Sequence, residues 1–245
     1  MDLGQVKECP KPGKLHVVEG ELIRIAKGLL ARNLVRPVLQ HELIMVAGKP
    51  LFNAFFGVGK GKYLPDDAPE YPGAEILRFI MNLTCTNSLC VPFKADIGAL
   101  PFYGQWKNII VDERHDLSWS YDDMKGCFYL FAMPGSWAPY FCFRHAYTAG
   151  ELGVVGLPES TPLWLGATTV PMGFCNAMGI IQYAHRRVHI GPQAGSLPSL
   201  PLSREIRKDH AVPPLKAHAP ALQEAWSVYC DDADVPRVTV PTGDS

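Results

Sequence analysis

The chain has 245 residues, of which 47% are hydrophobic and 19% are charged, and its formal net charge is −1. This composition excludes a disordered or collagen-like chain and predicts one compact unit or two interleaved subdomains. The near-neutral charge argues against a protein that coats nucleic acid electrostatically, although it leaves room for a local basic groove.

In the first half of the chain, residues 1–15 are polar and rich in Pro and Gly, and they predict a loose lead-in. Apolar residues at helical spacing predict a helix over residues 19–33. Short apolar, aromatic runs predict strands over residues 50–58 and 76–83. A charged loop containing Lys60 and Lys62 joins these two runs, so we expect a hairpin with a long, charged tip.

The second half of the chain alternates short apolar runs with turn residues. Strands are predicted over residues 117–121, 140–147, 163–170, 225–229 and 237–240. Residues 125–131 favour a helix or turn, and residues 175–187 favour a buried helix. The stretch 189–220 is rich in Pro, Gly and Ser and is locally basic, which predicts an inserted loop.

Cysteine usage and the absence of targeting signals indicate the cellular compartment in which the protein is found. The 7 cysteines are scattered singly, with no Cys-x-x-Cys pair, which favours reduced thiols over a structural zinc site. No apolar stretch approaches the roughly 20 residues of a membrane span, and the N-terminus does not resemble a secretory signal. We therefore expect an intracellular protein, in the cytoplasm or the nucleus, that has no membrane partner.

Three pairs of adjacent aspartates are the candidates for chemistry. Asp66-Asp67 lies among prolines, which predicts a solvated loop. Asp122-Asp123 and Asp231-Asp232 each follow an apolar strand candidate, where unpaired carboxylates are costly unless a cation or solvent offsets them. Carboxylates from two strands of one sheet suit Mg²⁺, but adjacent acids at strand ends are also common in ordinary surface turns.

Four segments, in the same order along the chain, resemble those of reverse transcriptases. Tyr229-Cys230-Asp231-Asp232 resembles the Tyr-x-Asp-Asp hairpin, and Asp123 with an aromatic Phe128 five residues later resembles the first catalytic segment. Residues 170–174, followed by a helix, are similar to the Leu-Pro-Gln-Gly-aromatic segment. Arg78 resembles the arginine of the fingers strand. The resemblance covers roughly positions 50–240 and is greatest to the polymerases of retroelements.

The resemblance implies an α+β fold: a right-hand polymerase palm, in which helices back an antiparallel sheet, with a fingers subdomain and no thumb. It implies that residues 16–105 are mostly fingers and that residues 106–245 are mostly palm, with the insertion at 189–220. The implied activity is RNA-directed DNA synthesis, in which a nucleotide from a dNTP is added to a primer 3′-hydroxyl on an RNA or DNA template.

Carried over residue by residue, the resemblance also implies roles at the site. Two Mg²⁺ ions, or Mn²⁺, are the implied cofactors, held chiefly by Asp123 and Asp231. Asp232 lies beside them, and the backbone carbonyl of Met124 completes the set. The implied nucleotide-binding residues are Arg78 with Lys60 or Lys62 for the triphosphate, Phe128 as a gate under the sugar, and Met172 with Gly173 near the nucleotide and template.

The sequence also departs from the family pattern. Met172 stands where glutamine is common, and Asn82 stands where aspartate is common. Residues 233–245 are too few for a thumb, and no ribonuclease H segment is recognisable, so we expect those parts in the rest of a Pol-like polyprotein. The alternative is a truncated or decayed, catalytically silent copy that keeps the fold and binds nucleic acid or protein. An unrelated metal-dependent enzyme with Asp-Asp turns is a third reading.

Overall fold

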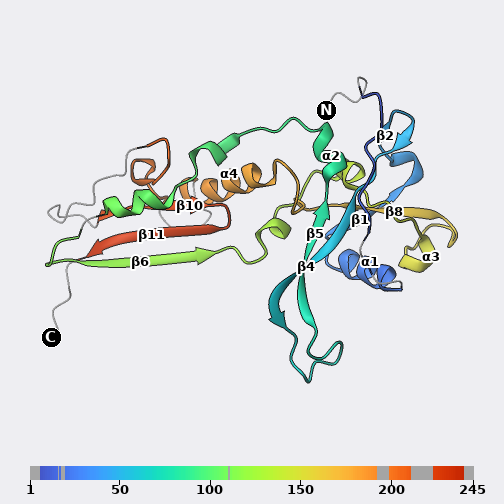
Figure 1. Ribbon diagram of the computed structural model, residues 1–245, viewed down its shortest axis with the longest axis horizontal. Coiled ribbons are helices and arrows are strands. Elements are labelled where there is room, and N and C mark those ends of the chain that lie inside the picture. The colour runs from blue at the N-terminus through green and yellow to red at the C-terminus, as the bar shows by residue number, and fades with distance from the viewer. Residues whose placement is uncertain are drawn as a thin grey trace. The chain divides into compact units, whose positions relative to one another are not determined.

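The computed structural model describes residues 6–15, 17, 20–109, 111–191, 199–210 and 223–239. Helices alternate with small antiparallel sheets, so the predicted α+β class is confirmed (Figure 1). The chain forms two compact units. Unit 1 contains Met1–Pro92 and Phe128–Ala177, and unit 2 contains Phe93–Cys127 and Met178–Ser245.

Unit 1 is built around a three-stranded antiparallel sheet in the order β1-β8-β7. Strand β8 (Pro162–Ala167) lies in the middle, between β1 (Val35–Leu39) and β7 (Tyr147–Thr148). Helix α1 (Glu21–Ala31) confirms the helix predicted over residues 19–33 and turns its buried residues to the core. Short elements of unit 1 include a 3-10 helix Gln40–Glu42, strands β2 (Met45–Val46) and β3 (Lys49–Pro50), and helix α3 (Ala149–Leu152).

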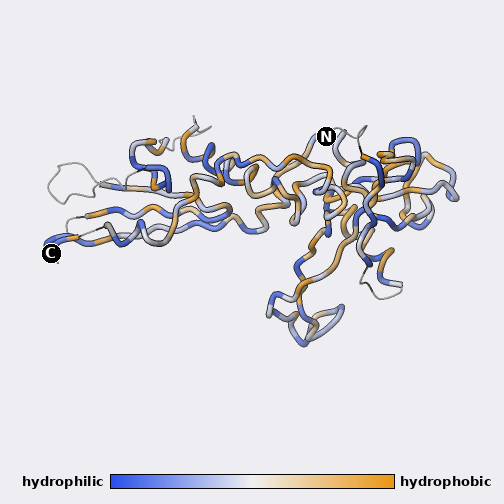
Figure 2. The backbone as a smooth tube through the Cα atoms, turned by 45° about the horizontal axis from the view of Figure 1, so that its top comes forward, coloured by the Kyte–Doolittle hydropathy of each residue, from blue (hydrophilic) through white to orange (hydrophobic). Residues whose placement is uncertain are grey.

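The predicted hairpin in the first half of the chain is also confirmed. Strands β4 (Ala54–Tyr63) and β5 (Glu75–Asn82) pair antiparallel, and the six-residue helix α2 (Thr84–Leu89) follows them. Burial falls along β4 from its base to its tip, and the colouring changes in parallel from hydrophobic to hydrophilic (Figure 2). At the base, Phe55 packs against the rings of Phe79 and Phe143, and this aromatic cluster anchors the hairpin in the unit.

The prediction of a strand over residues 140–147 is largely wrong. A 3-10 helix, Gly135–Phe141, occupies its beginning, and β7 takes only its last residue. Between them, Cys142 and Phe143 make single bridges, one to β8 and one to Asn53. The apolar run is therefore buried between β8 and Asn53, but it pairs with them through isolated bridges rather than a continuous ladder.

Unit 2 contains a four-stranded antiparallel sheet. Strands β10 (Ser227–Tyr229), β11 (Asp232–Thr239) and β6 (Asp116–Asp123) lie in that order, and β9 (Gln223–Glu224) also pairs with β11. Helix α4 (Ala177–Ile190) begins at the end of unit 1 and continues into unit 2. The 3-10 helices of this part are Ala95–Ala99, Tyr103–Asn108, Cys127–Leu130 at the boundary of the units, and Leu202–Arg204.

Both faces of this sheet carry apolar clusters. On one face, Trp226, Val228 and Ala233 are buried, with Ile190 of α4 packed against them. The other cluster joins Ile206, Ala225 and Val238, with Trp106, Ile109 and Val111 beside it. The strand pairs predicted around the last acids are therefore a real hairpin, although β11 begins at Asp232, five residues earlier than predicted.

The two units interleave along the chain, because residues 128–177 supply β8 as the partner of β1. The division into residues 16–105 and 106–245 stays a prediction. The assignment of these parts to fingers and palm stays a prediction. The insertion at 189–220 lies partly outside the described residues, since 192–198 and 211–222 are not described. No helix in the described part of the chain is long and apolar enough to cross a membrane.

Candidate active site

The hairpin of β10 and β11 places two aspartates at its turn. Tyr229 pairs with Asp232, so Cys230 and Asp231 form a two-residue connection. Cys230 has a φ of 59°, in the left-handed region. A two-residue turn of the II′ kind needs a positive φ at its first position, because only then does its twist match that of the strands. The turn therefore holds a non-glycine residue in an unfavourable conformation beside the acids.

Strand β6 brings the third aspartate to this turn. Strands β6 and β11 are neighbours in the sheet (Figure 1), and Asp123 is the direct partner of Asp232 in their register. Directly opposed residues of an antiparallel pair lie on the same face of the sheet. The backbone N–H of Met124 donates a hydrogen bond to the carbonyl oxygen of Asp231 at 2.9 Å. Asp123, Met124, Asp231 and Asp232 are thus brought together within unit 2.

Charge repulsion is concentrated at this point. The pKa of Asp232 is raised above its usual range by burial, and then by the negative charges of Asp231 and Asp123. The hydroxyl of Tyr121 donates a long hydrogen bond to Asp232 at 3.4 Å, which offsets the shift only in part. Burial raises the pKa of the neighbouring Cys127 thiol to about 12, and the charge of Asp231 adds to this effect. A cation at the acids would relieve this repulsion.

The aspartates at the turn offer a small set of oxygen ligands for a metal ion. Within the described residues, no three histidine, cysteine, aspartate or glutamate side chains are grouped so that they could hold a metal ion by themselves. Mg²⁺ is commonly held by one or two carboxylates, with waters and substrate phosphates as the remaining ligands. The opposed pair Asp123 and Asp232, with Asp231 in the turn, fits that smaller requirement.

The predicted triphosphate contacts lie on the β4–β5 hairpin of unit 1. Arg78 in β5 is the direct partner of Val58 in β4. The side chains of Arg78, Lys60 and Lys62 are all exposed. The hairpin therefore carries three cations that solvent or a ligand can reach.

Met172 and Gly173 pack through their backbones against the base of the same hairpin. The carbonyl of Met172 accepts a hydrogen bond from the N–H of Met81 at 3.2 Å, and the carbonyl of Gly173 accepts one from the Asn87 side chain at 2.8 Å. Gly173 has a φ of 109°, and a Cβ there would collide with the carbonyl oxygen of Met81. This glycine is therefore required by the backbone. Phe128, in the 3-10 helix that begins at Cys127, is half-buried.

The predicted site residues thus fall into two sets. The three aspartates and Met124 belong to unit 2, whereas the cations, Phe128, Met172 and Gly173 belong to unit 1. The structure describes the geometry within each set, and the role of every one of these residues stays a prediction.

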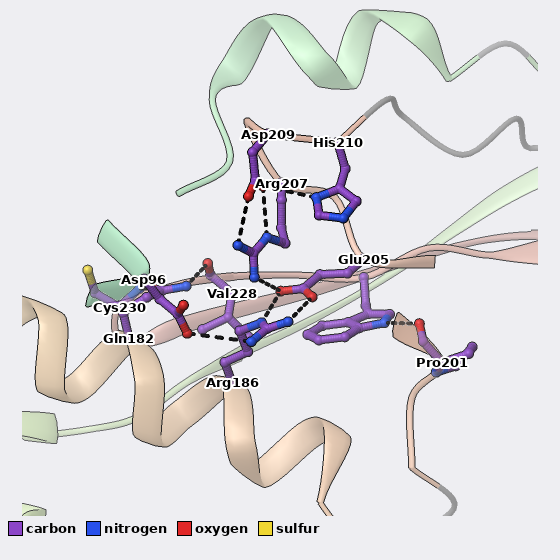
Figure 3. Close-up of polar contacts among 11 residues, drawn as sticks. Asp96, Gln182, Arg186, Pro201, Glu205, Arg207, Asp209, His210, Val228 and Cys230 are labelled. Atoms are coloured by element: carbon purple, nitrogen blue, oxygen red, sulfur yellow. Dashed lines mark hydrogen bonds and ion pairs between the residues drawn. The ribbon is translucent and has the colours of Figure 1, made fainter. Parts of the chain in front are cut away.

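A network of charges lies in unit 2 next to the hairpin of β10 and β11 (Figure 3). Arg186 of α4 makes two hydrogen bonds, of 2.6 and 2.8 Å, to the carboxylate of Glu205, which is 5% exposed. Arg186 also lies 3.5 Å from Asp96. Arg207 of the predicted basic insertion is paired with Asp209, so this cation is engaged within the protein. The described part of the insertion is therefore tied to α4.

A hollow of about 650 Å³ adjoins the acids within unit 2. Its walls include Phe102, Trp106, Lys208, Tyr229, Asp232 and Asp234. Asp234 accepts a hydrogen bond from the indole N–H of Trp119 at 2.8 Å. The acid face is therefore bordered by aromatic side chains and one lysine.

Sequence reasoning missed two polar residues that contact the turn. Gln182 and His185 lie on α4, and each is only 3% exposed. The sequence shows them only as two polar residues, three positions apart, in a helix predicted to be buried. That spacing places them on one face of the helix, but it does not indicate what they face.

The chain was compared with known proteins. No family model matches it, and no curated protein matches it. Among solved structures, it is similar to the foamy viral protease-reverse transcriptase in complex with double-stranded DNA, at 11% identity and a TM-score of 0.48 over 95% of this chain and 34% of that one. A second foamy viral structure, of the protease-reverse transcriptase dRH with double-stranded DNA, gives the same identity, TM-score and coverage of this chain, and 29% of that one is covered. The chain thus spans about a third of the length of these proteins, and a likeness of this size defines neither a family nor an activity.

Proposed function

We propose that this chain is the core of an RNA-directed DNA polymerase. In this reaction, a primer 3′-hydroxyl attacks the α-phosphate of a dNTP on an RNA or DNA template, and pyrophosphate leaves. The observation that carries the proposal is the opposition of Asp123 and Asp232 on neighbouring strands, with Asp231 in the turn between β10 and β11. The four ordered segments that resemble reverse transcriptases support it.

In this proposal, unit 2 supplies the palm and the β4–β5 hairpin belongs to the fingers. Asp123 and Asp231 would be the principal ligands of Mg²⁺ or Mn²⁺, assisted by Asp232 and the carbonyl of Met124. When bound, two such ions activate the attacking hydroxyl and stabilise the charge of the leaving pyrophosphate. The carboxylates themselves hold negative charge in one place: burial and then the charges of Asp231 and Asp123 raise the pKa of Asp232.

The remaining residues would bind and orient the nucleotide. Arg78 and the fingertip cations Lys60 and Lys62 suit a triphosphate, because each carries a positive charge that is exposed. Phe128 would lie under the sugar, where a bulky ring leaves room for deoxyribose only. Met172 and Gly173 would lie near the nucleotide and template. The rest of a Pol-like polyprotein, with the thumb that grips the primer duplex, would be the partner of this chain.

Primer extension tests the proposal. The chain is incubated with a primed RNA template, dNTPs and Mg²⁺, and compared with the double variant Asp231→Asn, Asp232→Asn. The matched control is Asp66→Asn, Asp67→Asn, an adjacent and exposed aspartate pair in the loop between β4 and β5. We expect extension by the parent and by the control, and a loss of at least about 100-fold in the turn variant.

Two results would contradict the proposal in different ways. Equal extension by the parent and the turn variant would show that the acids do not act in the reaction. No extension by the parent, with binding of the primed template retained, would favour the catalytically silent copy that binds nucleic acid. Binding is measured by fluorescence anisotropy of a labelled template-primer.

A further inference from the structure

Two buried side chains of α4 hold the turn that carries the acids. The Gln182 side-chain oxygen accepts the N–H of Cys230 at 2.7 Å, and its amide nitrogen donates to the carbonyl of Val228 at 2.9 Å (Figure 3). The Nδ1 atom of His185 lies 2.8 Å from the carbonyl oxygen of Cys230. Because a carbonyl only accepts, Nδ1 carries the proton in this contact. Its other nitrogen, Nε2, lies 3.2 Å from Nε2 of His189.

These contacts provide hydrogen-bond partners for the outer edge of strand β10. β10 is the outer strand in the order β10-β11-β6, so its outward backbone groups have no partner in that order. Residues two apart on a strand point to the same side, which aligns the carbonyl of Val228 with the N–H of Cys230. A primary amide offers both an acceptor and a donor, so Gln182 pairs with this edge as a short piece of strand would. Each of these buried backbone groups would destabilise the fold if left without a partner.

The same contacts bear on the conformation of Cys230. Its φ of 59° is one that an L-residue adopts only at a steric cost. Gln182 holds the N–H on one side of this residue and His185 holds the carbonyl on the other, so the two peptide planes that define its conformation are both held. Asp231 follows directly, and its carbonyl accepts the N–H of Met124. Cys230, which α4 contacts on both sides, is therefore followed directly by the first acid of the turn.

We propose that Gln182 and His185 are positioning residues, which keep Cys230 in its left-handed conformation and thereby set the positions of Asp231 in the turn and of Asp232 opposite Asp123. Their effect on catalysis rests on the proposed polymerase function. Their effect on the turn does not, because it is visible in the hydrogen bond from Met124 to Asp231.

The test uses Gln182→Met, which removes both hydrogen bonds and keeps a similar length and helix propensity. The control is Tyr183→Met, at the next position of α4, where the side chain is 55% exposed. We expect the Met124 amide to exchange hydrogen about 10-fold faster in Gln182→Met and at the parent rate in Tyr183→Met. In primer extension, kcat should fall by about 10- to 100-fold while the KM for dNTP stays unchanged, because misplaced acids affect the chemical step.

A rescue separates positioning from general packing. Glycine adopts a positive φ without steric cost, so the effect of Gln182→Met should be smaller when Cys230→Gly is also present. The effect is read from a double-mutant cycle that uses the single Cys230→Gly variant as its reference. A side chain that merely filled space would show the same loss in both backgrounds, and that result would overturn the proposal.

A second pair of variants covers the case in which Gln182→Met does not fold. His185→Phe removes the donor and keeps a ring, whereas His185→Asn keeps a donor at a similar position. Faster Met124 exchange in the first and near-parent exchange in the second supports positioning, and equal exchange in both refutes it. If the parent does not extend primers, the polymerase proposal fails, but the Met124 exchange rates still decide whether these residues position the turn.

Discussion

At the scale of single residues, the acids are placed where they cost stability. Asp123 and Asp232 are directly opposed across two strands, and Asp231 adds a third negative charge in the turn. Like charges in this position repel, and cross-strand pairs generally contribute about 0.2–1 kcal/mol in either direction. Proteins retain such unfavourable arrangements mainly at functional sites, where the strained or repulsive geometry serves the chemistry.

Replacing one of these charges should therefore stabilise the protein. The pKa of Asp232 is raised in the folded state, so its ionisation costs stability as pH rises from the ordinary aspartate value of about 3.9 through the raised folded pKa. Asp232→Asn removes this cost and keeps an oxygen that can accept the Tyr121 hydroxyl. We expect its free energy of unfolding to exceed that of the parent by about 0.2–1 kcal/mol at pH 7, and by less at pH 4.

The measurement is urea denaturation of the parent and Asp232→Asn at the two pH values. Asp67→Asn is the control, since this side chain is exposed in the loop between β4 and β5. A gain of the same size at pH 4 and pH 7 would show that the ionisation of Asp232 is not its cause.

At the scale of elements, α4 connects the acid hairpin with the charged network. One helix carries Gln182 and His185, which hold the turn, and Arg186, which holds Glu205. The backbone of Glu205 also forms a single parallel β-bridge with Trp226. The described part of the insertion therefore contacts both the helix and the hairpin. The insertion is therefore a structural part of unit 2 in its described residues.

Removing Arg186 should be costly because the buried Glu205 loses both short hydrogen bonds and keeps a longer ion pair, of 3.9 Å, to Arg207. Breaking a buried pair by deleting one partner typically costs about 3–5 kcal/mol, whereas replacing both partners with apolar residues is often neutral. We expect Arg186→Met to destabilise unit 2 by this amount, and the double variant Arg186→Met, Glu205→Met to recover most of the loss. Denaturation by urea, followed by tryptophan fluorescence, measures both.

An exposed pair of the same unit provides the control. Arg237 and Glu224 lie 2.6 Å apart, but their side chains are 45% and 24% exposed, so Arg237→Met should cost under about 1 kcal/mol. A similar loss in Arg186→Met and Arg237→Met would mean that burial of Glu205 does not govern the energy of the network.

At the scale of the whole molecule, each unit is assembled from two separated stretches of chain. β1 lies before residue 93 and its partner β8 lies after residue 127, so neither stretch of unit 1 can complete its sheet alone. Val38 in β1 and Leu163 in β8 are both fully buried. The fold of unit 1 therefore depends on contacts between residues more than 100 positions apart.

Truncation distinguishes this arrangement from a simple division at residue 105. A fragment of residues 1–105 lacks β8, so we expect its β1 amides to exchange with an opening free energy close to 0. A fragment of residues 1–177 contains both stretches of unit 1 and should protect the same amides. Hydrogen exchange followed by mass spectrometry measures both fragments, and equal protection of β1 in the two would contradict the interleaved arrangement.

Local patterns predicted much of the fold. Apolar spacing located α1 and α4, alternation and aromatic content located β4, β5, β6 and β8, and the acids after strand candidates indicated the turn of β10 and β11. These signals depend on which face of a segment is apolar, which is a local property of the chain. The prediction over residues 140–147 failed because an apolar run is equally compatible with burial between single bridges, as at Cys142.

From the sequence alone one can read which residue types are available at the site: three aspartates drawn from two adjacent pairs, and an ordered set of segments that resembles reverse transcriptases. Three further features depend on how distant segments pack: Asp123 opposes Asp232, the backbone near Met81 requires Gly173, and Gln182 pairs with the edge of β10. Strand register and the partners of buried polar groups arise from contacts between distant parts of the chain. A buried glutamine in a helix has to find a partner, but its sequence neighbours carry no information about which edge provides it.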